Sequence, residues 1–351
     1  MNHQANAVLA KVRGMYGRML TPAQYEELLR KQSLPEISAY LREKTSYAKA
    51  LAGVQDSAVH RGLLEDLLER DQFHQYERVL HYIDPQEGVW RIVTLNLEVE
   101  LLLSCLRGII SGRQQESLLA DLPTALQPWV RFKMVDLVGV QSVEQLAQVL
   151  EHTPYGPALR ELLERYPPLP DRQVRYTSIE MGLRARYYTT LLEWAAQSTR
   201  GQAASQLREL IGMRAELLNL TALWRVKTYF PDQKAGWVDQ LLPFRCKLTL
   251  REWQAMVKAP DRAALEALVR RSWYGRRLPV EAGEPIEVLA GRLRCQVCRR
   301  WMRFATDPQV VYTAYMMLRT METEDIVRII EGVRYRMPPD RIEKLLVKTK
   351  G

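Results

Sequence analysis

Apolar residues recur at helical spacing along most of this chain. In residues 34–41, 143–150 and 265–269 they stand at positions i, i+3 and i+4, with charged residues between them. This period places the apolar side chains on one face of an α-helix. Each of the three runs is therefore expected to be a short amphipathic helix.

Longer helices are predicted between these runs, and strand signals are nearly absent. Residues 62–82, 179–197 and 287–304 have a continuous helical pattern, and no alternating β-branched stretch is bounded by Asn-Gly or Asp-Gly. Prolines mark the breaks instead and are expected to end helices rather than to turn hairpins; they lie at Asp84-Pro85, Tyr166-Pro167-Pro168, Phe230-Pro231 and Met337-Pro338-Pro339. The fold class is predicted to be all-α.

A short pattern built on tyrosine follows each of the three amphipathic runs. A Ser or Thr, any residue, a Tyr and, four residues later, a Leu occur around Tyr47, Tyr155 and Tyr274, with 108 and 119 residues between the tyrosines. A second pattern, which begins with a glutamate, follows in the same order at spacings of 118 and 106; its members are Glu98, Glu216 and Glu322. Two independent markers that repeat in one order predict three diverged copies of one helical unit.

The three copies are assigned to residues 1–113, 114–235 and 236–351, the last returning to complete the C-terminal end. Thr21, followed by Pro22, and Thr249 are good N-cap residues for the first helix of their copies. The middle copy lacks this start signal and has residues 132–139 in its place. We interpret the repeated Tyr and Glu positions as residues that hold each unit together.

Composition supports a folded protein with a basic surface. The 351 residues are 47% hydrophobic and 26% charged, with 18 Gly and 18 Pro, and the formal net charge is +9. Such a surface favours anionic partners without choosing among nucleic acid, lipid and protein. The largest basic cluster could be a solvated helix face, which we favour, or an anion-binding stripe; it contains Arg292, Arg294, Arg299, Arg300 and Arg303.

No segment reaches the roughly 18 uninterrupted apolar residues that a membrane span needs. The most apolar stretch, residues 95–110, contains Glu98, Glu100 and Arg107, and the first 20 residues lack the pattern of a secretory signal. The protein is therefore expected in the cytoplasm, where its four cysteines would stay reduced.

Candidate chemistry is sparse. Cys295 and Cys298 lack a second Cys or His pair for zinc and lie inside an expected helix, so two core-facing thiols are the better interpretation. His74 and His81 share a helix face and are interpreted as surface or partly buried residues. No phosphate-binding glycine loop, nucleophile elbow or His-Glu-x-x-His motif occurs. We predict no catalytic residue, no cofactor and no metal site.

Six tryptophans lie beside basic residues, an arrangement that could serve to stack nucleic-acid bases. Their helical spacing favours core packing instead; they are Trp129, Trp194, Trp224, Trp253, Trp273 and Trp301.

The two ends of the chain resemble a known family. The C-terminal run from Glu322 through Asp325 to Gly332-Val-Arg-Tyr335-Arg-Met-Pro-Pro339 is similar to the closing signature of the C-type subunit of the bacterial and archaeal vacuolar-type ATPase (V-type and A-type ATPase, or ATP synthase), the relative of the eukaryotic d-type subunit. Residues 12–20 and the region of Tyr47 look like the opening of that family. Asp325 stands where the family has Asn, and Arg336 where it has Gly.

The resemblance implies a non-catalytic subunit of the central stalk of a V/A-type rotary ATPase. Members of that family form a funnel-like socket of three helical units that receives the central shaft, of D- and F-type subunits, and sits on the membrane rotor ring of c/K-type proteolipid. The implied role is to couple shaft and ring during proton or sodium transport, or ATP synthesis, as a peripheral protein on the cytoplasmic side of the cell membrane without nucleic acid. The alternative is a basic helical-repeat scaffold that binds nucleic acid.

Overall fold

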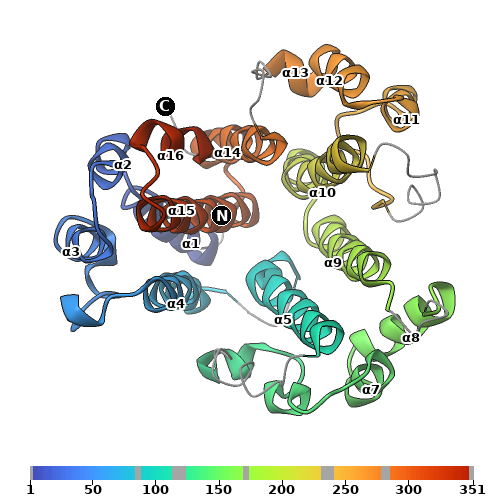
Figure 1. The fold of residues 1–351 in the computed structure, drawn as a ribbon, viewed down its shortest axis with the longest axis horizontal. Helices are drawn as coiled ribbons and strands as arrows, with labels where there is room; N and C mark the ends of the chain where they lie inside the picture. Colours follow the sequence, from blue (N-terminus) through green and yellow to red (C-terminus); the bar gives the residue numbers. More distant parts are fainter. Residues whose placement is uncertain are drawn as a thin grey trace. The chain divides into compact units, whose positions relative to one another are not determined.

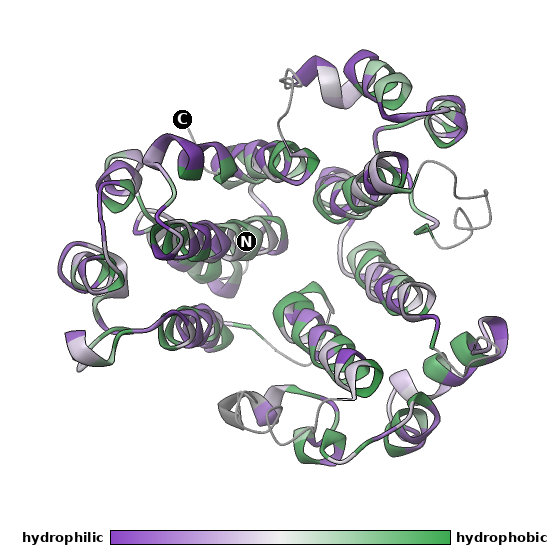
Figure 2. Cartoon of the chain, in the orientation of Figure 1, coloured by the Kyte–Doolittle hydropathy of each residue, from purple (hydrophilic) through white to green (hydrophobic). Residues whose placement is uncertain are grey.

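The computed structural model describes residues 3–83, 88–112, 124–168, 174–230, 241–277 and 285–347 (Figure 1). Within these ranges all regular secondary structure is α-helix or 3₁₀-helix, and no strand occurs. The all-α prediction is therefore confirmed. In Figure 2, polar and apolar residues alternate along the same helices, as amphipathic packing requires.

The chain forms two compact units. The first unit contains both ends of the chain, residues 1–90 and 245–351, together with residues 199–231, and the second contains residues 91–198 and 232–244. The three predicted copies follow other boundaries, and their number remains a prediction.

Helix α15 (Pro308–Arg334) is the centre of the first unit. It packs against α1 (His3–Tyr16), α4 (Arg61–Leu80) and α14 (Ile286–Phe304), and these helices lie side by side in Figure 1. Asp307 caps it by accepting hydrogen bonds from two backbone N–H groups of its first turn. Because α15 has neighbours on several sides, side chains are buried around most of its circumference.

Short helices cover the C-terminal half of α15. Helices α2 (Pro22–Leu29) and α3 (Leu34–Lys44) share one apolar core with it, and α16 (Pro339–Leu345) packs on both α15 and α2. Thr21 is the N-cap of α2, as the sequence predicted, and the structure adds a capping box between Thr21 and Gln24.

The rest of the first unit is built on α10 (Gly201–Tyr229). This helix packs against α14, α15 and α12 (Arg262–Arg271), and α12 contacts α11 (Leu250–Lys258) and α13 (Trp273–Arg277). Thr249 caps α11 and forms a capping box with Glu252. This second predicted N-cap is also confirmed.

The second unit is a chain of pairwise helix contacts. Helix α5 (Ile92–Ser111) packs on α9 (Tyr176–Ser198), α9 on α8 (Tyr155–Arg165), and α8 on α7 (Val143–Val149). A 3₁₀-helix, η5 (Met134–Leu137), lies in the segment that lacks the predicted start signal. Across the described part of the chain, no helix is both long and apolar enough to span a membrane.

Prolines end helices at two of the four predicted breaks. Helix α8 ends at Arg165 and α10 at Tyr229, each shortly before a proline. At the third break the prediction was incomplete, because Pro338 caps α16 and Pro339 opens it; its fixed φ suits the first turn of a helix. The Asp84-Pro85 break lies outside the described residues.

Arg336 ends α15 in a left-handed conformation. Its φ is +53°, and it is the only residue other than glycine with a positive φ among those the structure describes. The turn is closed by a hydrogen bond of 2.9 Å from the Met337 N–H to the Gly332 carbonyl. This is the position where the resembled family has Gly, so the departure noted in the sequence leaves a strained backbone.

Replacing this arginine by the family's residue should stabilise the protein. We expect Arg336→Gly to raise the free energy of unfolding by about 1 kcal/mol, since relief of the left-handed strain exceeds the extra chain entropy of Gly. Denaturant unfolding measures the change. Arg334→Gly, in the last turn of α15, is the control and should cost about 1 kcal/mol. An Arg336→Gly protein no more stable than the original would contradict this account.

Candidate functional site

The repeated tyrosines and glutamates meet in three buried hydrogen bonds. In each pair the phenol O–H donates to the carboxylate, and both side chains are at most 2% exposed. The pairs, with the distances between their oxygen atoms, are Tyr155 with Glu98 (2.6 Å), Tyr274 with Glu216 (2.5 Å) and Tyr47 with Glu322 (3.3 Å). We call these the three Tyr–Glu pairs.

Two of the three glutamates pair with the tyrosine of the following predicted copy. Glu98 and Glu216 stand 57 and 58 residues before their partners. Glu322 instead pairs with Tyr47, at a sequence separation of 275 residues. The last glutamate thus returns to the first tyrosine, and this contact ties α15 to the N-terminal segment.

Backbone N–H groups are the second kind of donor to these carboxylates. Glu216 accepts from the N–H groups of Cys246 (2.9 Å), Lys247 (2.7 Å) and Leu248 (3.2 Å), directly before the Thr249 N-cap. Glu322 accepts from the Leu20 N–H at 2.8 Å, directly before the Thr21 N-cap. Each glutamate therefore fixes the start of a short helix against its own long helix.

The middle segment keeps this contact although it has lost the N-cap threonine. The backbone N–H of Arg131 donates to Glu98 at 2.9 Å, and the Arg131 guanidinium adds an ion pair at 2.7 Å. The tertiary hydrogen bond to Glu98 thus persists where the local start signal does not.

The three pairs differ in how the buried negative charge is balanced. Glu98 has two ion pairs, with Arg131 and with Arg91 at 3.3 Å. Glu322 has an ion pair with Arg319 at 2.5 Å. Among the residues that the structure describes, Glu216 has none and depends on the phenol and the backbone N–H groups. A buried carboxylate without a cation is most sensitive to the loss of a donor.

The phenols remain protonated donors throughout the ordinary pH range. Burial, and then the adjacent glutamate, raises the pKa of Tyr155 and of Tyr274 well above its usual value. Burial also raises the pKa of Tyr47, although Arg319 partly opposes this. Since none of the three ionises, the pairs serve as fixed hydrogen bonds and not as acid–base groups.

The hydroxyl residue two positions before each tyrosine shapes the turn that presents the phenol. Ser272 donates through Oγ to the Val269 carbonyl at 2.7 Å and accepts from the Tyr274 N–H at 3.2 Å. Thr153 and Thr45 make the same two contacts with their own neighbours. The Leu of the pattern is buried at Leu51 and Leu159, and Leu278 lies outside the described residues.

In two of the three patterns the residue after the tyrosine must be glycine, which sequence reasoning missed. A Cβ on Gly275 would lie 2.4 Å from the Arg270 Cα, and one on Gly156 would lie 2.5 Å from the Leu150 carbonyl oxygen. The sequence signal for this close approach was the glycine that directly follows the tyrosine in two of the three patterns. Ala48 occupies the position in the first pattern, within a 3₁₀-turn, Ser46–Ala48.

The other sequence candidates are brought into no reactive arrangement. Cys295 and Cys298 are buried thiols on α14 outside any disulfide, as predicted, and burial raises the pKa of Cys298. His74 and His81 are exposed on or next to α4. No group of three potential metal ligands occurs in the described ranges. The six tryptophans are buried or half-buried.

The basic cluster on α14 does not form a single stripe. Arg300 pairs with Glu209 of α10, which also accepts from the Trp301 indole at 2.7 Å, and Arg292 donates to the Leu346 carbonyl at 3.4 Å. Arg303 is exposed. Part of the cluster therefore anchors α14 to its neighbours.

Residues 8–345 match the family described as ATP synthase (C/AC39) subunit. The chain belongs to this family. It is 22% identical over 346 residues to the C-type subunit of the A-type ATP synthase of Pyrococcus abyssi, covering 96% of this chain and 88% of the relative. It is 25% identical over 281 residues to the corresponding A-type ATP synthase subunit of Methanosphaera stadtmanae, covering 76% and 65%.

Membership of the ATP synthase (C/AC39) subunit family confirms the resemblance of the two chain ends. It also makes the chain an accessory subunit and not a catalytic one, as the sequence predicted. The Tyr–Glu pairs lie within the matched residues and are interpreted as part of the scaffold of this family member.

Removing one phenol from this C/AC39 subunit should destabilise it according to the charge balance of its pair. Tyr274→Phe is expected to lower the free energy of unfolding by about 2–3 kcal/mol, because Glu216 then loses a donor that no cation replaces. Tyr155→Phe should cost about 1–1.5 kcal/mol, since two arginines remain on Glu98. Denaturant unfolding measures both. Tyr229→Phe, on an exposed side chain, is the control and should change little; equal losses at Tyr274 and Tyr229 would refute this role of the phenol.

A methyl group added at Gly275 should lower the stability of the protein, whereas one added at Gly14 should raise it. Gly275→Ala forces a clash with the backbone of α12 and is expected to cost at least about 2 kcal/mol. Gly14→Ala meets nothing within 4 Å in α1 and should stabilise the protein by about 1 kcal/mol. Thermal unfolding of the two variants gives the signs. A stabilising Gly275→Ala would show that this close approach is not required.

Proposed function

We propose that the chain is a non-catalytic central-stalk subunit of a V/A-type rotary ATPase, which couples the central shaft to the membrane rotor ring. Its partners would be the D- and F-type shaft subunits and the c/K-type ring proteolipid, on the cytoplasmic side of the cell membrane. The coupling would serve proton or sodium transport driven by ATP hydrolysis, or ATP synthesis in the reverse direction. The observation that carries the proposal is the set of three Tyr–Glu pairs, in a chain whose residues 8–345 match the family.

Resistance to deformation is what such a coupler needs, and the Tyr–Glu pairs supply it. Each pair links a long helix to the start of a distant short helix through buried, charge-assisted hydrogen bonds. Helix α15 is further held to α4 by the Arg319–Asp71 ion pair and by a hydrogen bond of 2.7 Å from Gln72 to Thr320. Packed helices tied in this way transmit force with little strain.

The threefold recurrence supports a socket built from three related units. The same phenol, carboxylate, hydroxyl and backbone contacts recur in one order, which favours the predicted copies at residues 1–113, 114–235 and 236–351. The return of Glu322 to Tyr47 supports a unit completed by both chain ends. Three such units around a shared axis would form the funnel-like socket for the shaft.

Peripheral attachment to the ring is supported by charge. The chain carries a net charge of +9, and no helix in its described part could span a membrane. Basic residues would therefore help to seat the protein on acidic ring loops or anionic headgroups.

Co-purification tests the proposal directly. A tagged copy of the chain, expressed in its own host and extracted in mild detergent at low salt, is expected to bring down a coiled-coil shaft subunit and a small membrane ring protein. Mass spectrometry of the eluate identifies both. Recovery of neither, with the tagged chain folded by circular dichroism, would overturn the proposal.

Charge reversal on α14 tests whether this helix contributes to binding the ring protein. We expect R299E/R303E to weaken recovery of the ring protein at least about threefold and to flatten its salt dependence. R251E/K258E on α11 changes the net charge equally and is the matched control. Arg300 is left intact, because reversing it would also break the ion pair with Glu209. Equal behaviour of the two variants would remove α14 from the proposed contact.

A further inference from the structure

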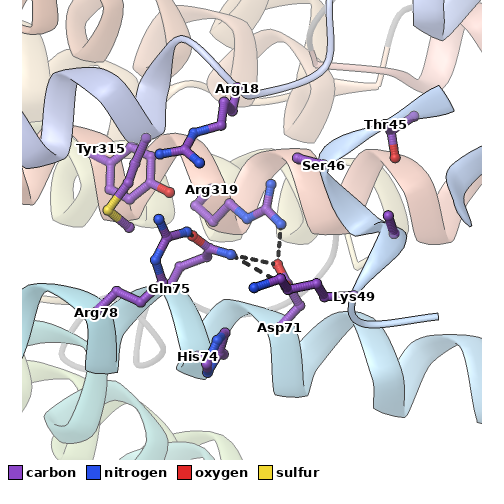
Figure 3. A pocket seen from close by; sticks show the side chains of 12 residues that line it. Arg18, Thr45, Ser46, Lys49, Asp71, His74, Gln75, Arg78, Tyr315 and Arg319 are labelled. Atoms are coloured by element: carbon purple, nitrogen blue, oxygen red, sulfur yellow. Dashed lines mark hydrogen bonds and ion pairs between the residues drawn. The ribbon is translucent and has the colours of Figure 1, made fainter. Parts of the chain in front are cut away.

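A basic pocket of about 280 Å³ lies within the first unit, between α4, α15 and the segments after α1 and α3 (Figure 3). Its wall includes Arg18, Lys49, Arg78 and Arg319, one carboxylate from Asp71, and the phenol of Tyr315. These side chains come from separate elements of the chain, so the fold itself gathers the positive charge.

Three of the four cations have no carboxylate partner among the described residues. Arg18 donates only to the Gly14 carbonyl, at 3.3 Å, and Arg78 donates to the side-chain amide oxygen of Gln75, at 2.9 Å. Lys49 is exposed and makes no ion pair with any residue in the described ranges. Asp71 is already paired with Arg319, so the pocket keeps an excess of positive charge.

Arg319, the fourth cation, is already committed to carboxylates. Its side chain is 3% exposed, and its two terminal nitrogens are used by Glu322 and Asp71. Arg319 is therefore neutralised inside the fold, and the free positive charge of the pocket comes from Arg18, Lys49 and Arg78.

Tyr315 adds a neutral donor on the same side. In Figure 3 its hydroxyl points toward the interior of the pocket, near Arg18 and Arg319. Burial raises the pKa of Tyr315 to about 12, so the phenol keeps its proton. It can therefore donate to an anion at neutral pH.

We propose that this pocket binds a phosphate group carrying more than one negative charge. Arginine guanidinium groups match phosphate oxygens in pairs, and three uncompensated cations favour a multiply charged ligand over a single carboxylate. The volume lies just below the roughly 300–1,000 Å³ of drug-sized ligand sites, so the pocket takes phosphate groups and not a whole nucleotide. Two sources fit this chemistry: a free phosphate or pyrophosphate, and a phosphomonoester lipid headgroup.

Titration calorimetry with pyrophosphate tests the proposal on the full chain. The original protein is expected to bind with a dissociation constant below about 1 mM, and K49Q/R78Q should bind at least about tenfold more weakly. R251Q/K258Q removes the same charge from α11 and should change affinity less than about twofold. Should K49Q/R78Q fail to fold, K49Q alone is used, because the Lys49 side chain is exposed and unpaired.

A vesicle flotation assay separates the two sources. Vesicles of phosphatidylcholine with phosphatidic acid are compared with vesicles of phosphatidylcholine alone. Flotation that needs phosphatidic acid and is lost in K49Q/R78Q assigns the site to a lipid headgroup, whereas pyrophosphate binding without flotation assigns it to a free phosphate. If the original protein binds neither, or if both double variants weaken equally, the pocket is not a phosphate site. Co-purification tests the proposed rotor role separately, so either idea can fail without the other.

Discussion

A carboxylate taken out of water must find hydrogen-bond donors, and this constraint organises the whole chain. Three glutamates on three long helices are fully buried, and each obtains a tyrosine phenol and at least one backbone N–H from a segment distant in sequence. The partner segments must therefore hold a fixed position. The Ser or Thr two residues before the tyrosine and the small residue after it follow from this demand, since both shape the turn that presents the phenol.

The sequence predicts the helices and both markers, but not the way in which the markers pair. Apolar period and N-cap chemistry suffice for helices such as α2 and α11, because these are local signals. The Tyr and Glu positions can be recognised as repeats because only a phenol and a carboxylate form this buried hydrogen bond. That Glu322 would reach Tyr47 could not be derived, as nothing local distinguishes it from a pairing with Tyr274. Arg131 and Arg319 were missed because, in a basic chain, buried arginines look like surface ones.

The net charge of the chain overstates how much positive charge is free. Arg91, Arg131, Arg300 and Arg319 neutralise carboxylates that are buried or nearly so. These arginines are internal counter-ions that make the scaffold possible, and they are poor candidates for recognising a partner. The cations that neutralise no carboxylate, among them Arg18, Lys49 and Arg78, are a smaller set. Their position around one pocket says more about where an anion would bind than the total charge does.

The contact between the first and last parts of the chain has a consequence for biosynthesis. Tyr47 and Leu20 receive their carboxylate from Glu322, which is translated 275 and 302 positions later, and Ile37 and Leu41 share a core with Ile326 and Ile329. At about 5–20 residues per second, the ribosome leaves these early segments incomplete for roughly 15–60 seconds. During that interval their apolar faces must stay loosely collapsed or be shielded by a chaperone. The first unit is completed only when α15 leaves the ribosome.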